Sequence, residues 1–218
     1  MTRRPALACT ASASVASALL HDGRITVGAE GDLAVQVQGL LRAADLRAAD
    51  LTELRVDVGP GSYTGLRVAV TFARFLAAFG GAELRTLTRF EIVAAGLFPE
   101  PATARLRFLI DARRDRLCTA CVDVGERITL RAEPRTLSRE DLLAELEGEG
   151  VSEAGRRWLP DERALGFARE HAPAHGASVV EHPLVCDARS MFDARLGARV
   201  CPPALAEPLY PMGSYVED

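Results

Sequence analysis

A glycine-rich loop at residues 58–65 is the stretch of this sequence whose residue types and spacing best suit chemistry. It reads GPGSYTG from Gly59 to Gly65 and lies between a short apolar segment and a long one. Glycines permit positive φ angles and the close approach of a ligand or a second backbone. A helix that starts here would offer unpaired N–H groups and a positive dipole end, and the hydroxyls of Ser62 and Thr64 would add donors. The loop therefore has the composition of an anion site.

Three well-known loops of this kind do not fit. A Walker loop needs a lysine, and this sequence contains none. The dinucleotide fingerprint G-x-G-x-x-G fails because Thr64 stands where the third glycine belongs. A nucleophile elbow fails because Ser62 is not centred between two glycines. The alternative is a tight turn with a helix N-cap at Ser62 or Thr64, and the spacing alone leaves both interpretations open.

Other candidate side chains favour structural roles. Cys118 and Cys121 have metal-ligand spacing, but they lie in a strand-like run, where residues three apart point to opposite faces. His171 and His175 have such spacing only on a helix, and Pro173 interrupts it. We therefore predict no metal site and no catalytic constellation.

The composition is that of an ordinary globular protein. The 218 residues are 48% hydrophobic and 26% charged, with a net charge of −4. No apolar run reaches the roughly 20 residues that span a bilayer, so we expect a cytoplasmic protein with no membrane contact. A mildly acidic chain with scattered arginines is a poor candidate for binding RNA by itself, so if the protein works on RNA we expect a partner to do the binding. Five cysteines, an odd number, argue against a disulfide framework.

Alternating patterns predict the elements that position the loop. Apolar runs predict strands at 6–9, 14–20, 24–28, 54–58, 83–87, 106–111, 116–124 and 128–132. Helical periods and caps predict helices at 31–44, 65–79, 88–96, 141–147, 161–171 and 187–200. Asp22-Gly23 predicts a hairpin turn, Asp111 with Arg113 and Arg114 predicts a charged one, and 202–218 predicts an extended tail. This order favours a mixed α/β sheet covered by helices.

The helix predicted at 65–79 is apolar nearly all round. Arg67, Thr71 and Arg74 form its only polar line. Such a helix needs cover on more than one side, from its own sheet and from a neighbouring helix or another subunit.

Several segments resemble a known family. The sequence GPGSYTGLRV at 59–68 resembles the GPGSFTGLR signature of the TsaB family, the YeaZ-type members of the Gcp or glycoprotease-like proteins. LIDARR at 109–114 is similar to the family's IDAR, and EPLY at 207–210 is similar to its P-x-Y. LACTAS at 7–12 lies where the family has LDTST. The resemblance is strong from 54 to 79.

The resemblance implies an actin-like ATPase (ribonuclease H-like) fold of two α/β lobes, with mixed sheets flanked by helices and the second lobe reduced. The lobes would be 1–102 and 103–218. It implies a non-catalytic scaffold that dimerises with a catalytic TsaD-like subunit for the threonylcarbamoyladenosine modification at position 37 of tRNA. A TsaE-like ATPase would join through the complex.

The resemblance also implies where the partner binds. The helices at 31–44 and 65–79 would bind the TsaD-like subunit through Leu33, Val37, Leu40, Ala44, Leu66, Ala69, Val70, Phe72, Ala73 and Leu76. The signature loop would contact an anion or nucleotide through Gly59, Gly61, Ser62, Thr64, Gly65 and Arg67. No cofactor is expected to bind tightly, and ATP or ADP would lie at the partner interface.

The sequence departs from the family at two places. Cys9 stands at the position of the aspartate that ends the family's first strand, and a thiol is a poor ligand for a hard cation. Glu30, Gly31 and Asp32 stand where the family commonly has a histidine. The alternatives are therefore a divergent paralogue that acts as a hydrolase or protease through Ser62, or a nucleotide-binding protein. A homodimer through the same helices is a further alternative.

Overall fold

The chain forms two compact units. The computed structural model describes residues 4–100, 102–148 and 156–211. Unit 1 comprises Met1–Leu97 and Val185–Tyr210, and unit 2 comprises Phe98–Leu184 and the chain from Pro211. The sequence placed all of 103–218 in the second lobe, whereas the structure returns 185–210 to the first. The reason is a strand pairing that no local sequence pattern predicts. It joins Arg199 to Thr86 and Val200 to Arg85.

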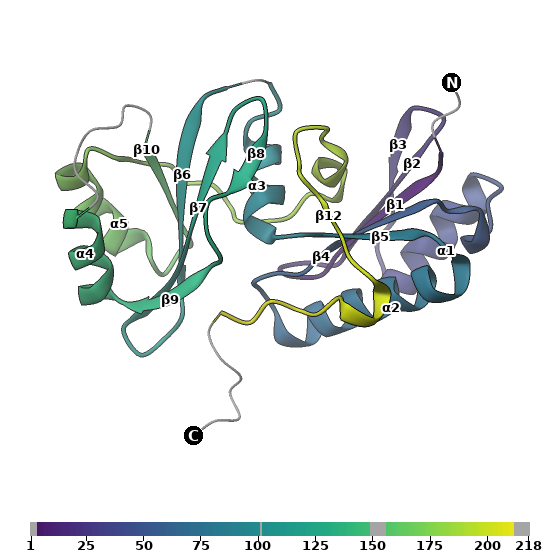
Figure 1. The fold of residues 1–218 in the computed structure, drawn as a ribbon, viewed down its shortest axis with the longest axis horizontal. Helices are drawn as coiled ribbons and strands as arrows, with labels where there is room; N and C mark the ends of the chain where they lie inside the picture. The colour runs from purple at the N-terminus through teal and green to yellow at the C-terminus, as the bar shows by residue number, and fades with distance from the viewer. Residues whose placement is uncertain (1–3, 101, 149–155, 212–218) are drawn as a thin grey trace. The chain divides into compact units, whose positions relative to one another are not determined.

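Unit 1 is built on a mixed sheet in the order β12-β5-β4-β1-β2-β3 (Figure 1). Its strands are β1 (Ala6–Thr10), β2 (Ala16–His21), β3 (Arg24–Val27), β4 (Glu53–Asp57), β5 (Glu83–Leu87) and β12 (Arg199–Val200). β4 runs parallel to β1 and β5, and the other pairs are antiparallel. The predicted Asp22-Gly23 turn is confirmed, with φ angles of 48° and 78°. The parallel strands therefore end together at the edge where the glycine-rich loop begins.

Helices cover both faces of this sheet (Figure 1). Unit 1 contains α1 (Leu33–Ala43), α2 (Tyr63–Gly80) and α3 (Arg89–Leu97), and short 3-10 turns η1 (Ala48–Asp50), η3 (Ala188–Phe192) and η4 (Pro203–Leu205). α1 and α2 pack on the face that carries Leu54 and Val56. Arg55 and Asp57 alternate to the opposite face, where Arg55 donates to the carbonyl of Met191 in η3 and stacks on Phe192. Residues 185–210, which we call the returning segment, are thus part of the core layers of unit 1.

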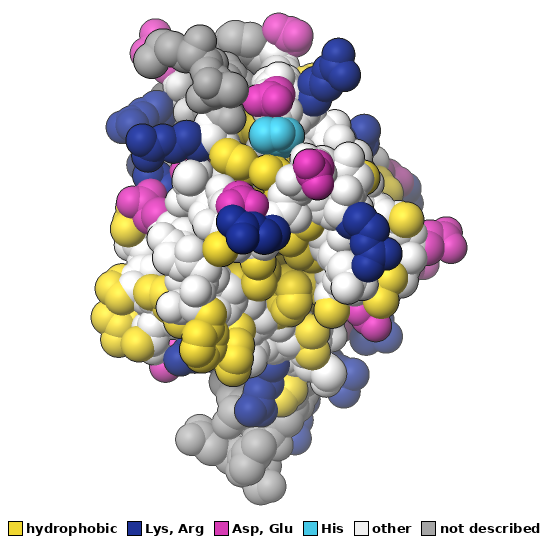
Figure 2. Space-filling model, turned by 90° about the vertical axis from the view of Figure 1, so that its right-hand side faces the viewer, with side chains coloured by type: hydrophobic (Ala, Val, Ile, Leu, Met, Phe, Trp, Pro, Cys, Tyr) yellow, Lys and Arg dark blue, Asp and Glu magenta, His cyan; other side chains and the backbone are white. Residues whose placement is uncertain are grey.

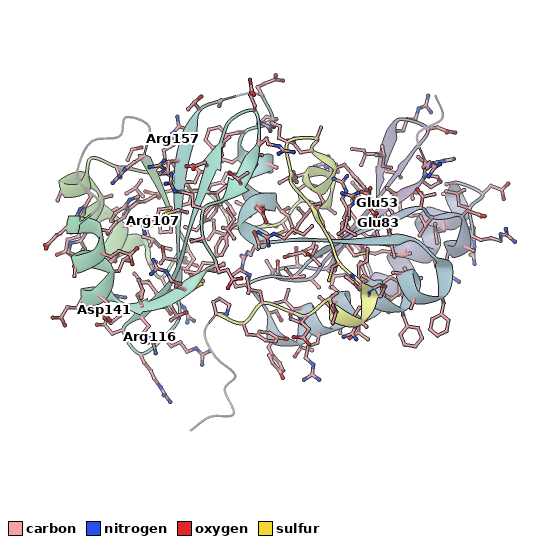
Figure 3. The ribbon with its side chains drawn as sticks, viewed as in Figure 1. Glu53, Glu83, Arg107, Arg116, Asp141 and Arg157 are labelled. Carbon is pink, nitrogen blue, oxygen red and sulfur yellow. The ribbon has the colours of Figure 1, made fainter. Side chains whose placement is uncertain are left out.

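An ion-pair network fastens the returning segment to the sheet. Glu53 and Glu83 are opposite neighbours on β4 and β5 (Figure 3), where two like charges would repel. Arg85 lies 3.3 Å from Glu53 and donates to Glu83 at 2.6 Å, which relieves this repulsion. Arg85 also donates to the carbonyl of Ala198 at 3.4 Å. The network therefore holds residue 198, next to β12, against β5.

Unit 2 has a second mixed sheet in the order β11-β10-β6-β7-β8, with β9 also paired to β7. Its elements are β6 (Ala104–Asp111), β7 (Arg116–Val124), β8 (Ile128–Leu130), β9 (Arg135–Ser138), α4 (Arg139–Gly148), β10 (Arg156–Pro160), α5 (Leu165–His171), η2 (Ala172–His175) and β11 (Ser178–Val179). α4 and α5 pack over a core around Leu109, Trp158 and Phe167. β9, β10 and β11 were not predicted, because they are short, and charged residues hide the pattern in β9 and β10.

The helix predicted at 187–200 is wrong. Residues 188–192 form the 3-10 turn η3, and 199–200 form β12. The side chain of Asp187 accepts from the backbone N–H of Arg189, and that of Asp193 accepts from Arg195. These local bonds compete with helical ones and end the turn.

None of the helices in the described part of the chain combines the length and the hydrophobicity that crossing a membrane requires.

Candidate functional site

The glycine-rich loop is anchored to the sheet by a buried carboxylate. Asp57 ends β4 and is fully buried. One of its oxygens accepts a hydrogen bond from Thr10 Oγ1 at 2.7 Å, and the other accepts from the backbone N–H of Gly59 at 2.7 Å. Gly59 has a φ of 102°, which a side chain would strain. The carboxylate therefore sets the path of the loop, and its two oxygens are committed to internal donors.

The next two glycines allow the loop to touch the end of β1. A Cβ atom on Gly61 would lie 2.2 Å from the carbonyl oxygen of Ser12, and one on Gly65 would lie 2.1 Å from that of Ala11. The backbone N–H of Ser62 donates to the Ser12 carbonyl at 2.7 Å. These glycines therefore allow the close approach of the protein's own backbone.

Ser62 is the N-cap of α2. Its Oγ accepts a hydrogen bond from the N–H of Gly65 at 3.2 Å, and the helix begins at Tyr63. The N-cap interpretation is confirmed at Ser62, while Thr64 lies exposed in the first turn. α3 has a capping box at its start, because Glu91 accepts from both the N–H and the hydroxyl of Thr88.

The cysteine at the family's aspartate position faces the core. Cys9 packs with Leu7, Leu54 and Val56 on the α2 side of the sheet, and burial raises the pKa of its thiol to about 12. Cys186 of the returning segment lies on the other side, 3.5 Å from Ser12 Oγ. Burial, and then the nearby charge of Asp57, raise the pKa of Cys186. Both thiols are therefore protonated near neutral pH.

Most of the side chains predicted to bind a partner lie inside unit 1. The structure buries Leu33, Val37 and Leu40 of α1, and Leu66, Ala69, Val70 and Ala73 of α2. Ala44, Phe72 and Leu76 are partly buried. The buried seven follow the helical stripe that faces the unit's own sheet, so a partner docking on the outside would not touch them.

The outer face of α2 carries a different apolar set. Val68, Phe75 and Phe79 are 51%, 63% and 80% exposed. With Tyr63, Phe72, Leu76 and η1 they line a groove of about 1030 Å³. We call this groove the α2 groove. A second hollow of about 500 Å³ between α1 and α2 shares Ala48, Phe72 and Leu76 with it. Hydrophobic side chains gather on the lower half of the face in Figure 2.

The returning segment packs beside the N-terminal half of α2. The ring of Tyr210 lies 5.0 Å from that of Tyr63, and the Leu209 N–H donates to the Val58 carbonyl at 2.7 Å. Arg67 donates to the hydroxyl of Tyr63 at 2.8 Å. Partial burial raises the pKa of Tyr210, which keeps its hydroxyl neutral. In the sequence Tyr63 and Arg67 belong to the motif at 59–68 and Tyr210 to the motif at 207–210, and the structure brings the two motifs together.

In unit 2 the sequence candidates have structural roles. The turn at Arg113 and Arg114 between β6 and β7 is confirmed, with positive φ angles at both. His171 packs 4.6 Å from the ring of Phe167, and His175 stacks 6.0 Å from Trp158. The two histidines therefore pack on aromatic rings of the unit 2 core.

The two mixed sheets with flanking helices define the chain as a protein of the actin-like ATPase fold. A crystal structure of an uncharacterized Pseudomonas aeruginosa protein with similarity to peptidase YEAZ matches with a TM-score of 0.76 and 21% identity, over 95% of this chain and 99% of that one. YeaZ from Pseudomonas aeruginosa matches with a TM-score of 0.72 and 21% identity, over 95% and 100%. At this identity the likeness concerns the fold.

The sequence comparison gives the family. The family model described as TsaD, tRNA N6-adenosine threonylcarbamoyltransferase, matches residues 32–161, and the chain belongs to this family. The tRNA threonylcarbamoyladenosine biosynthesis protein TsaB of Bacillus subtilis (strain 168) is 34% identical over 83 residues. That match covers 38% of this chain and 35% of the relative, so it spans about a third of the relative's length.

Proposed function

We propose that this chain is a non-catalytic subunit that docks onto a TsaD-like catalytic subunit and supports formation of threonylcarbamoyladenosine at position 37 of tRNA. The observation that carries the proposal is the α2 groove, an apolar helix face next to the signature loop that unit 1 leaves uncovered. The family match and the Bacillus subtilis relative favour this pathway.

The exposed apolar area suits association between subunits. Val68, Phe75 and Phe79 lie at i, i+7 and i+11, along one face of α2. Burying one large apolar side chain contributes about 1.5–3 kcal/mol. The neighbouring hollow against α1 extends the surface beyond a single helix. A helix pair from the partner would fill such a surface better than a small ligand would.

The loop supports a non-catalytic role. Asp57 at the end of β4, Thr10 at the end of β1 and Ser62 in the loop all bond to internal groups. Cys9 points into the core rather than toward the loop. We propose that ATP or ADP binds at the interface with the partner, and that a TsaE-like ATPase and tRNA reach this chain through the complex.

The test is binding to the TsaD-like subunit of the same organism. Light scattering after size-exclusion chromatography should show a complex of the two chains. Phe75→Glu with Phe79→Glu should weaken binding at least about 100-fold, because two charges would enter an apolar contact. Ile25→Glu on β3, where the native side chain is 43% exposed, is the matched control and should bind normally.

The outcomes separate the alternatives. A complex that survives the double change contradicts docking through the α2 groove. No complex with wild-type protein, together with a homodimer that the double change dissociates, would show that the groove serves self-association instead. The absence of both a complex and a homodimer would contradict the proposed function.

A further inference from the structure

Two arginines lie one heptad apart on α2, and the first of them, Arg67, lines the α2 groove. Arg67 and Arg74 lie on the same side of α2, since seven residues are close to two turns. At 1.5 Å per residue their positions are about 10.5 Å apart along the helix. α2 contains no Asp or Glu to offset them.

Both arginines are held in place, Arg67 by Tyr63 of α2 itself and Arg74 by the returning segment. The Arg67 guanidinium lies 5.3 Å from the Tyr63 ring centroid and donates to its hydroxyl, while Tyr210 packs on the same ring. Arg74 donates to the carbonyl of Ala204 in η4 at 3.3 Å. Long side chains that are already ordered lose less entropy on binding. This side of α2 therefore presents two oriented cations.

The charge of this side of α2 differs from that of its surroundings. Across the α2 groove, Arg47 is paired with Asp50 at 3.2 Å, so that rim is locally balanced. Residues 201–210 contain a single acid, Glu207, and the whole chain has a net charge of −4. Arg67 and Arg74 are thus a local excess of positive charge on an acidic protein, directly beside an apolar groove.

We propose that the partner presents an amphipathic helix whose apolar stripe fills the α2 groove and whose two carboxylates, one heptad apart, pair with Arg67 and Arg74. This inference rests on the proposed docking function and specifies the chemistry of its partner. A guanidinium suits a carboxylate because it offers paired donors in a plane. Such pairs set the register and the partner choice of a helical interface.

The test measures binding to the TsaD-like subunit by titration calorimetry at 50 and 500 mM NaCl. Wild-type affinity should fall with salt, because the pairs are screened. Arg67→Glu with Arg74→Glu should weaken binding about 100-fold at low salt and should reverse the salt dependence, because repulsion is then what salt screens. Arg24→Glu, at an exposed site on β3, is the control and should leave the affinity unchanged.

A neutral pair, Arg67→Gln with Arg74→Gln, guards against misfolding of the reversed variant. It should flatten the salt dependence with a loss of about 10-fold. If the wild-type affinity does not depend on salt and the Arg67 and Arg74 variants bind as tightly as the wild type, the inference is overturned and the docking proposal stands. Absence of any wild-type complex instead contradicts the docking proposal itself.

Discussion

The two sides of α2 differ in the size of their apolar residues. The inner side carries Ala69, Ala73 and Ala77, all buried against β4 and its neighbours. The outer side carries Phe75 and Phe79, both mostly exposed. Small residues let a helix lie close to a sheet. Large residues on the opposite side of the helix are out of reach of that sheet, so only another element or another protein could cover them. The inner side therefore serves stability, and the outer side is free to serve association.

α1 shows what the outer side of such a helix ordinarily looks like. It packs on the same face of the sheet through Leu33, Val37 and Leu40. Its solvent side carries Gln38 and Arg42, with Val35 as an isolated apolar residue. The aromatic outer side of α2 is thus a property of that helix and not of the fold.

The largest expected effect comes from a charge on the inner side of α2. Ala69→Arg should destabilise unit 1 by about 4 kcal/mol or more, because the guanidinium would be buried without a partner. Val68→Arg, one residue away on the outer side, should change the stability by less than about 0.5 kcal/mol and should weaken partner binding. Urea unfolding checks both, and equal destabilisation by the two changes would abolish the distinction between the sides.

A smaller effect is expected where α2 meets the end of β1. Gly61→Ala or Gly65→Ala should cost about 3 kcal/mol, because each new methyl group would overlap a backbone oxygen. Gly39→Ala in α1 is the matched control, since a Cβ there meets nothing within 4 Å. It should stabilise the protein by about 1 kcal/mol. Thermal unfolding measures all three. If Gly65→Ala left the stability unchanged, the backbone at Ala11 would have to move aside to accommodate the new methyl group.

The smallest effect is expected at the cap of α2. Ser62→Ala removes the hydrogen bond to the Gly65 N–H and should cost about 1 kcal/mol, whereas Ser62→Gly should cost a few tenths. Complex formation should survive, because the outer side of α2 is unchanged. Loss of a hydrolase activity of the isolated chain on Ser62→Ala would instead support the enzyme alternative.

Much of unit 1 could be predicted from sequence. The turn signal at Asp22-Gly23 and the cap signal at Ser62 coincide with the structure because they act locally. β12 could not be predicted, because two residues pair with β5 only after 185–210 has returned to unit 1. The periodic pattern at 187–200 misled because Asp187 and Asp193 bond to their own backbone neighbours.

The proposed docking surface could be predicted only in part. The apolar excess of α2 was visible, but the pattern could not separate the residues that its own sheet covers from those left outside. In the structure, small residues four apart, Ala69, Ala73 and Ala77, mark the covered side. That spacing is a sequence signal which, combined with the size of Phe75 and Phe79, would have pointed to the outer side. Tyr63 and Tyr210 are far apart in the sequence, so no local pattern could have predicted their contact.

The return of 185–210 to unit 1 has a consequence for synthesis on the ribosome. All of residues 98–184 must be translated before Arg55 can find the Met191 carbonyl and before β5 can gain its outer neighbour. Until then the nascent first unit leaves the outer edge of β5 unpaired, a hazard for pairing with other chains. Most of unit 2 is one continuous stretch, Phe98–Leu184, which can fold as it emerges, whereas unit 1 must wait for residues 185–210.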